Sequence, residues 1–133
     1  MISREDLESF LIRTEMEYEE IGECLWIVDP PGGTATGEPA VVLSYSPPLV
    51  VFRAKIGTVP EGAEDRLKLY EQLLTLNATD LVHGAYGLDG NEIVLSDTLQ
   101  LADLDFSEIQ ASLESILMAL RSHFETLSRY RNP

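Results

Sequence analysis

Hydrophobic residues recur every three or four positions in three stretches of the chain, which is the spacing of an amphipathic helix. The first stretch covers residues 4–14 and follows Ser3, which with Asp6 makes a variant of the capping box that begins many helices. The second covers residues 63–76. The third begins after the capping residue Asp105 and is the longest. The pattern therefore predicts three helices.

Shorter apolar runs lie between the predicted helices, and their β-branched and aromatic residues indicate strands. They cover residues 16–28, with a kink expected at Gly22, and residues 40–45, 49–56, 82–88 and 91–98. Apolar and basic residues alternate along 49–56, which is typical of an antiparallel sheet with one solvated face. The sequence predicts an α+β fold in which about five antiparallel strands pack with three helices, in the order α-β-β-β-α-β-β-α.

Turn-forming residues separate these elements. Ser46-Pro47-Pro48 divides the two middle strands, because prolines cannot donate hydrogen bonds to a strand ladder. Asp89-Gly90 suits the type I′ turn of a hairpin. Residues 29–39 contain prolines and glycines without apolar periodicity, so we expect a loop there. Asn77 is placed to end the middle helix in the left-handed conformation.

The composition fits a single globular domain that covers residues 1–133. Nine basic and 23 acidic residues give a net charge of −14, and so acidic a surface repels phosphate backbones and anionic membranes. We therefore expect neither nucleic acid nor a membrane as a partner. The single cysteine, Cys24, fits a reducing cytoplasm, and its apolar neighbours predict a small buried side chain.

Candidate catalytic chemistry is sparse. The two histidines, His83 in a predicted strand and His123 on the flank of the last helix, lie in no nucleophile motif. Four acidic residues near the last helix lack the spacing of a calcium loop: Asp97, Asp103, Asp105 and Glu108. We therefore expect no enzymatic activity, no metal and no cofactor.

The middle helix has more hydrophobic surface than one sheet can cover. One stripe at helical spacing contains Leu67, Tyr70 and Leu74. Further leucines widen the apolar arc to roughly half of the helix circumference: Leu69, Leu73 and Leu76. Two explanations stay open, because the helix could be deeply buried within one chain or could bury a second face in a two-fold homodimer.

Four short motifs occur along the second half of the chain. They are Leu73-Leu74-Thr75-Leu76-Asn77, the glycine-rich His83-Gly84-Ala85-Tyr86-Gly87-Leu88-Asp89-Gly90, Val94-Leu95-Ser96-Asp97-Thr98-Leu99, and Leu104-Asp105-Phe106. Together they resemble the YbjN family, which shares the fold of type III secretion class I chaperones. The resemblance extends over residues 3–128 and implies the same order of helices and strands as the pattern does. Most of the matching positions are expected to be structural: Leu73, Leu74, Asn77, Tyr86, Gly87, Leu99 and Asp105.

The resemblance also implies a class of function. Members of this chaperone-like group are small, acidic, cytoplasmic, often dimeric and not enzymes, and the secretion chaperones wrap an extended effector segment over apolar patches. The resemblance therefore implies a cytoplasmic protein-binding module, and it supplies no catalytic residues.

We accordingly expect a non-enzymatic module that forms a homodimer and holds a partner protein against an apolar surface bordered by acidic residues. The candidates for self-association are Leu69, Leu73 and Leu76, and the candidates for partner binding are Leu49 and Val51, on the sheet face away from the core. Two alternatives stay open. One is a small-molecule or metal-binding regulatory domain that uses His83 and the acids near 97–105, and the other is a structural subunit of a larger assembly.

Overall fold

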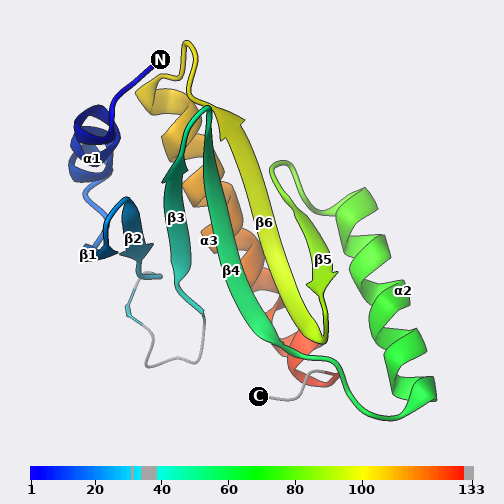
Figure 1. Cartoon of the computed structure of the whole chain (residues 1–133). Helices are drawn as coiled ribbons and strands as arrows, with labels where there is room; N and C mark the ends of the chain where they lie inside the picture. Colours follow the sequence, from blue (N-terminus) through cyan, green and yellow to red (C-terminus); the bar gives the residue numbers. More distant parts are fainter. Residues whose placement is uncertain (31, 34–38, 131–133) are drawn as a thin grey trace.

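The computed structural model describes residues 1–30, 32–33 and 39–130, which form three helices and six strands (Figure 1). Part of the predicted 29–39 loop lies outside these ranges. In chain order the elements are α1 (Arg4–Arg13), β1 (Tyr18–Gly22), β2 (Leu25–Val28), β3 (Val41–Ser46), β4 (Leu49–Thr58), α2 (Ala63–Thr79), β5 (Ala85–Asp89), β6 (Glu92–Gln100) and α3 (Phe106–Ser128). The predicted α+β class is confirmed.

The strands form one antiparallel sheet in the order β1-β2-β3-β4-β6-β5. The first four strands are neighbours in chain order, whereas α2 carries the chain from β4 to the far edge of the sheet (Figure 1). There β5 pairs with β6 through the predicted Asp89-Gly90 turn, and Gly90 has the positive φ of 61° that such a turn requires. The edges of the sheet are therefore β1 and β5.

The strand count differs from the prediction because residues 16–28 contain a hairpin of two strands instead of one kinked strand. The pairing register shifts between Glu20 and Gly22, and the turn that follows places Cys24 at a φ of 62°. Cys24 is half-buried in this turn and does not belong to a strand, contrary to the expectation. The sheet has six strands where about five were expected.

One face of the sheet carries the core. α3 lies along this face, α1 lies next to the start of α3, and α2 lies beside β5 (Figure 1). The Phe10 ring of α1 contacts the Phe106 ring of α3 at 6.2 Å between centroids. The largest fully buried side chains include Trp26, Phe52, Leu43, Leu95, Ile109, Leu113 and Ile116. Within the described ranges, no helix covers the opposite face of the sheet.

The starts of α1 and α3 are as predicted, and the end of α2 is not. The Asp6 N–H donates to the Ser3 hydroxyl at 3.1 Å, and the Glu108 N–H donates to the Asp105 carboxylate at 3.0 Å. By contrast, α2 continues to Thr79, so Asn77 lies inside the helix and does not end it. The prediction at Asn77 was wrong because its side chain binds β5, a tertiary contact that no local pattern shows.

Candidate protein-binding surfaces

The sheet face opposite α3, called the outer face from here on, includes the residues predicted to bind a partner. Leu49 and Val51 lie on this face of β4 and are half-buried, while Val50 and Phe52 point into the core. Val42 and Ser44 of β3 belong to the same face. A shallow hollow of about 440 Å³ crosses it, lined in part by Val42, Ser44, Val51, Arg53 and Val94. The outer face therefore offers half-exposed aliphatic side chains outside the core.

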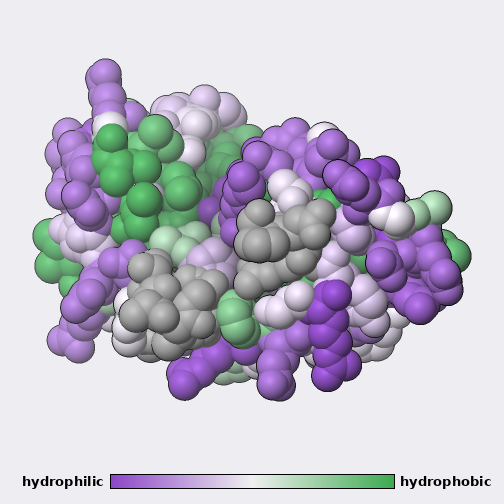
Figure 2. All heavy atoms as spheres, turned by 90° about the horizontal axis from the view of Figure 1, so that it is seen from below, coloured by the Kyte–Doolittle hydropathy of each residue, from purple (hydrophilic) through white to green (hydrophobic). Residues whose placement is uncertain are grey.

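Ion pairs cover the other half of the outer face. Arg53 donates to the Asp89 carboxylate at 2.6 Å, and the Lys55 ammonium lies 3.1 Å from the Glu92 carboxylate. Val94 of β6 lies on this face between β4 and β5 and is only 6% exposed. The apolar half therefore lies toward β2 and β3. Figure 2 views the molecule from below and not onto the outer face, and it shows a cluster of hydrophobic residues on the left, the side on which α1 and the β1–β2 hairpin lie in Figure 1.

The structure places the three leucines expected in self-association within the core of a single chain. Leu69, Leu73 and Leu76 are 0%, 5% and 6% exposed. Of the two alternatives left open by the sequence, these values agree with a helix that is deeply buried within one chain. The other stripe of α2 faces outward, with Leu67 58% and Leu74 69% exposed. The exposed apolar side chains of α2 therefore include Leu67 and Leu74, and not the three buried leucines.

The exposed stripe of α2 continues onto β5. A groove of about 290 Å³ runs between them, lined by Tyr70, Leu73, Leu74, Asn77, Tyr86, Gly87 and Leu88. Leu88 is 46% exposed beside it. The exposed leucines Leu67, Leu74 and Leu88 form what we call the α2–β5 surface. The periodicity of the sequence indicated the excess of apolar residues on α2 but not which stripe would stay exposed.

The motif residues that carry the family resemblance support the fold through hydrogen bonds, packing or helix capping, with one exception. Asn77 binds the backbone of Tyr86, Leu99 packs against the core, and Asp105 caps α3. Leu74 is the exception, because it is exposed.

The two glycines of the β5 segment differ in their surroundings. A Cβ at Gly84 would lie 2.8 Å from the Ser96 carbonyl oxygen, and Gly84 has a φ of 82°. The backbone of β6 therefore lies close to Gly84. At Gly87 the same atom would meet nothing within 4 Å among the described residues.

A partly buried polar network joins the C-terminal end of α2, β5 and α3. The Tyr86 hydroxyl lies 2.7 Å from His123 Nδ1, and His123 Nε2 lies 3.2 Å from the Asp80 carboxylate. Burial, and to a lesser extent the Asp80 charge, raises the pKa of Tyr86, so the phenol stays protonated beside the imidazole. His123 is 6% exposed and therefore buried, although the sequence placed it on the flank of the last helix. His123 lies three residues after Leu120 and four before Leu127, and residues at this spacing share one face of a helix. The sequence spacing therefore indicated that His123 would be buried.

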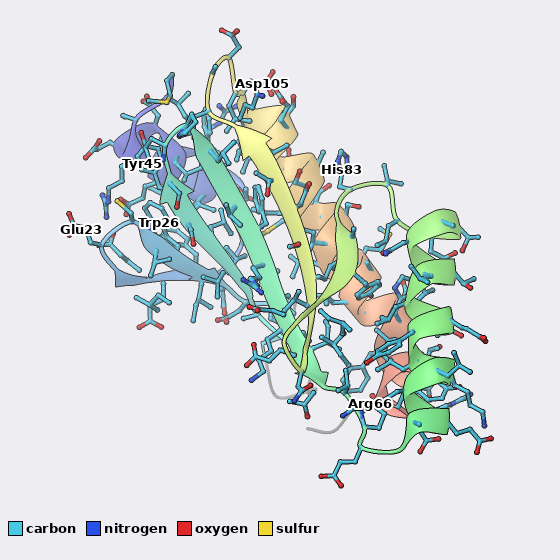
Figure 3. The ribbon with its side chains drawn as sticks, turned by 45° about the vertical axis from the view of Figure 1, so that its right-hand side comes forward. Glu23, Trp26, Tyr45, Arg66, His83 and Asp105 are labelled. Carbon is cyan, nitrogen blue, oxygen red and sulfur yellow. The ribbon has the colours of Figure 1, made fainter. Side chains whose placement is uncertain are left out.

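The residues considered for metal or small-molecule chemistry do not form a cluster. His83 lies in the loop before β5, and Asp105 lies at the start of α3 (Figure 3). In the part of the chain that the structure describes, no group of three or more His, Cys, Asp or Glu side chains is arranged to hold a metal ion. Asp105 and Glu108 belong to the helix cap, as the sequence indicated.

A comparison with family models identifies the class of protein. The model CesT_Tir_1 matches residues 3–132, so the chain belongs to the CesT_Tir_1 family. The YbjN and type III chaperone resemblance seen in the sequence is thereby confirmed. The comparison with curated proteins gave no match. Among the described residues, no helix has the length and hydrophobicity needed to cross a membrane.

Solved structures share the fold at low sequence identity. YbjN from E. coli is 16% identical with a TM-score of 0.68, and the match covers 94% of this chain and 93% of that chain. In the ExoU–SpcU complex of the type III secretion system of Pseudomonas aeruginosa, the matching chain is 18% identical with a TM-score of 0.62, covering 91% and 93%. The structure of the Yersinia pestis type III secretion chaperone SycH with a fragment of YscM2 is 17% identical with a TM-score of 0.58, covering 90% and 98%. These matches establish the fold.

Proposed function

We propose that this protein is a non-enzymatic protein-binding module that acts as a homodimer and holds a partner polypeptide against the outer face of its sheet. The observation that carries the proposal is the pair of half-exposed aliphatic residues, Leu49 and Val51, on a face that no described helix covers. Apolar side chains outside a monomer's own core are typical of protein interfaces. The solved structures of ExoU–SpcU and of SycH with YscM2 are complexes of this fold with a second protein, which supports the same class of function.

The α2–β5 surface supports the homodimer part of the proposal. A two-fold interface buries the same patch on both chains, and Leu67, Leu74 and Leu88 offer such a patch at one edge of the fold. Because this patch does not include Leu49 or Val51, one chain can use both surfaces at once. The single cysteine is compatible with the cytoplasm, where we place the protein.

The test is quantitative affinity capture of the tagged full chain from its own cells at low and moderate salt. Leu49→Glu/Val51→Glu places two charges on the outer face, and Thr75→Glu/Ser122→Glu places the same charges at exposed helix positions as a matched control. We expect a partner that survives moderate salt with the wild type and the control and is lost with the outer-face variant, provided that circular dichroism shows both variants folded. A partner that the outer-face variant retains contradicts the proposal.

A further inference from the structure

A second groove lies on the opposite side of the molecule from the outer face. Two adjoining hollows of about 570 and 350 Å³ share Met16 and Leu117 in their linings. Together they extend from the segment between α1 and β1, past Asp29 and Pro30, to the exposed side of α3. The described residues that line them, called the methionine groove from here on, are Glu15, Met16, Glu17, Asp29, Pro30, Gly32, Gly33, Glu114, Leu117, Met118 and Arg121.

The floor of the groove is apolar. Met118 is 69% exposed on α3, whereas its neighbour Leu117 is only 6% exposed, and Met16 is half-buried beside them. Methionine side chains are unbranched and polarizable, so they adapt to the shape of an apolar group that is placed on them. An exposed Met118 next to a half-buried Met16 gives one bulky apolar side chain a place to bind.

The rim of the groove is acidic and unneutralised. Glu15, Glu17, Asp29 and Glu114 contribute four carboxylates against the single guanidinium of Arg121. Among the described residues, none of these four carboxylates forms an ion pair, whereas Glu8, Glu20, Glu64, Asp89 and Glu92 elsewhere each face a basic side chain. Within residues 1–30, 32–33 and 39–130, Arg121 is the one basic side chain in the lining, so a bound partner that carries basic residues would complement this rim.

We propose that the methionine groove binds a segment of another protein that presents one bulky apolar side chain flanked by lysine or arginine residues. The apolar side chain contacts Met16, Leu117 and Met118, and the flanking cations pair with the free carboxylates of the rim. A basic segment of another protein complements this acidic rim, whereas the proposed homodimer contact uses the α2–β5 surface instead. The proposal rests on the protein-binding function, but it uses residues that the outer face does not include.

The chain offers a built-in spectroscopic test, because it has only three methionines and two of them line the groove. The third, Met1, is 73% exposed and serves as an internal reference. The full chain labelled with ¹³C at the methionine methyl groups is titrated with the peptide acetyl-Gly-Lys-Arg-Phe-Arg-Lys-Gly-amide. We expect the Met16 and Met118 methyl signals to shift in a saturable way while the Met1 signal stays in place.

Charge-reversal variants separate a specific groove from general attraction to an acidic protein. Glu15→Lys/Glu17→Lys should weaken peptide binding by roughly tenfold, because it replaces attraction at the rim by repulsion. Glu61→Lys/Glu71→Lys changes the net charge equally at exposed sites outside the groove and should change binding by less than about twofold. Met118→Gln tests the floor without altering charge and should weaken binding on its own, whereas Val82→Gln, at an exposed position in the loop before β5, should leave binding unchanged.

Three outcomes would overturn the proposal. They are equal shifts at all three methyl signals, equal weakening by the two charge-reversal variants, and no shift at millimolar peptide. Each is independent of the outer face, because the peptide titration does not involve Leu49 or Val51. If the peptide titration fails but Leu49→Glu/Val51→Glu loses its partner, the proposed function still holds and the groove proposal does not. If the titration succeeds but that variant keeps its partner, the groove proposal holds and the outer-face proposal does not.

Discussion

The side-chain amide of Asn77 takes the place of a neighbouring strand for Tyr86 on the edge strand β5. Asn77 Nδ2 donates to the Tyr86 carbonyl oxygen at 3.1 Å, and the Tyr86 N–H donates to Asn77 Oδ1 at 2.7 Å. An edge strand has backbone groups without a strand partner, and this pair satisfies two of them from α2. One side chain thus fastens the middle helix to the sheet.

Removing this amide should loosen α2 from β5. Asn77→Ala leaves the Tyr86 N–H and C=O without partners, and we expect the free energy of unfolding to fall by about 1–3 kcal/mol. Urea denaturation followed by circular dichroism measures the loss. Thr75→Ala, at an exposed position of the same helix, should stay within about 0.5 kcal/mol of the wild type. A loss at Asn77 no larger than that of the control would show that the pair contributes little.

The hydrogen bond between Tyr86 and His123 should appear as a coupling energy. Tyr86→Phe removes the hydroxyl and His123→Leu removes the ring nitrogen, and a double-mutant cycle should give a coupling of about 1 kcal/mol. The raised pKa of Tyr86 also predicts the direction in which stability changes with pH. Above pH 10 the unfolded state loses the phenol proton while the folded state keeps it. Wild-type stability should therefore fall as the pH rises beyond 10, and Tyr86→Phe should lack this part of the fall.

The two leucine stripes of α2 should respond in opposite ways. Leu69→Ala creates a cavity in the core and should cost about 2–5 kcal/mol, whereas Leu74→Ala at an exposed site should change stability by less than about 0.5 kcal/mol. For self-association, Leu67→Glu/Leu74→Glu should give a folded monomer in analytical ultracentrifugation where the wild type is a dimer. A wild type that is already monomeric, or a variant that stays dimeric, would rule out the α2–β5 surface as the interface.

Gly84 and Gly87 should differ in how well they tolerate replacement by alanine. Gly84→Ala combines a positive φ with a Cβ 2.8 Å from a backbone oxygen, so we expect a loss of at least about 1 kcal/mol in thermal or urea denaturation. Gly87→Ala meets no atom within 4 Å and should be neutral or slightly stabilising. Similar losses at both positions would show that the space around the backbone does not decide the outcome.

The cap of α3 should make stability depend on acid pH. Hydrogen bonds from the Ser107 hydroxyl and the Glu108 N–H lower the pKa of Asp105, so its ionised form stabilises the fold above the ordinary value of 3.8. That contribution is lost as the pH falls through the lowered value. Asp105→Ala should be less stable than the wild type at pH 7, and the difference should shrink toward pH 2. A difference that stays constant with pH would mean that the carboxylate charge is not involved.

The hydrophobic pattern predicted most of the architecture because it records which face of each element is buried. The alternation along 49–56 predicted both the inward row of Val50 and Phe52 and the outward Arg53 and Lys55. The capping residues Ser3 and Asp105 predicted two helix starts, since a cap is a contact between residues close in sequence. The hairpin of β1 and β2 was missed because its turn at Cys24 lacks the usual glycine or asparagine at the positive-φ position.

The candidate surfaces were predicted less completely. Leu49 and Val51 lie on the outer face, as the alternation of β4 indicated, and their role as a binding site stays a prediction. The methionine groove has no local signature, because Met16 and Asp29 meet Leu117 and Met118 only after α3 has packed against the sheet.

The sequence by itself determined the class of fold, the order of most elements and the excess of apolar residues on the middle helix, because periodicity and caps act over a few residues. Only the tertiary structure decided which leucines of α2 are buried, since that depends on the direction from which β5 and α3 approach it. The tertiary structure likewise showed that Asn77 binds Tyr86 and does not end α2, and that His123 lies between Tyr86 and Asp80. Contacts between residues tens of positions apart depend on how whole elements pack, and no local pattern contains that information.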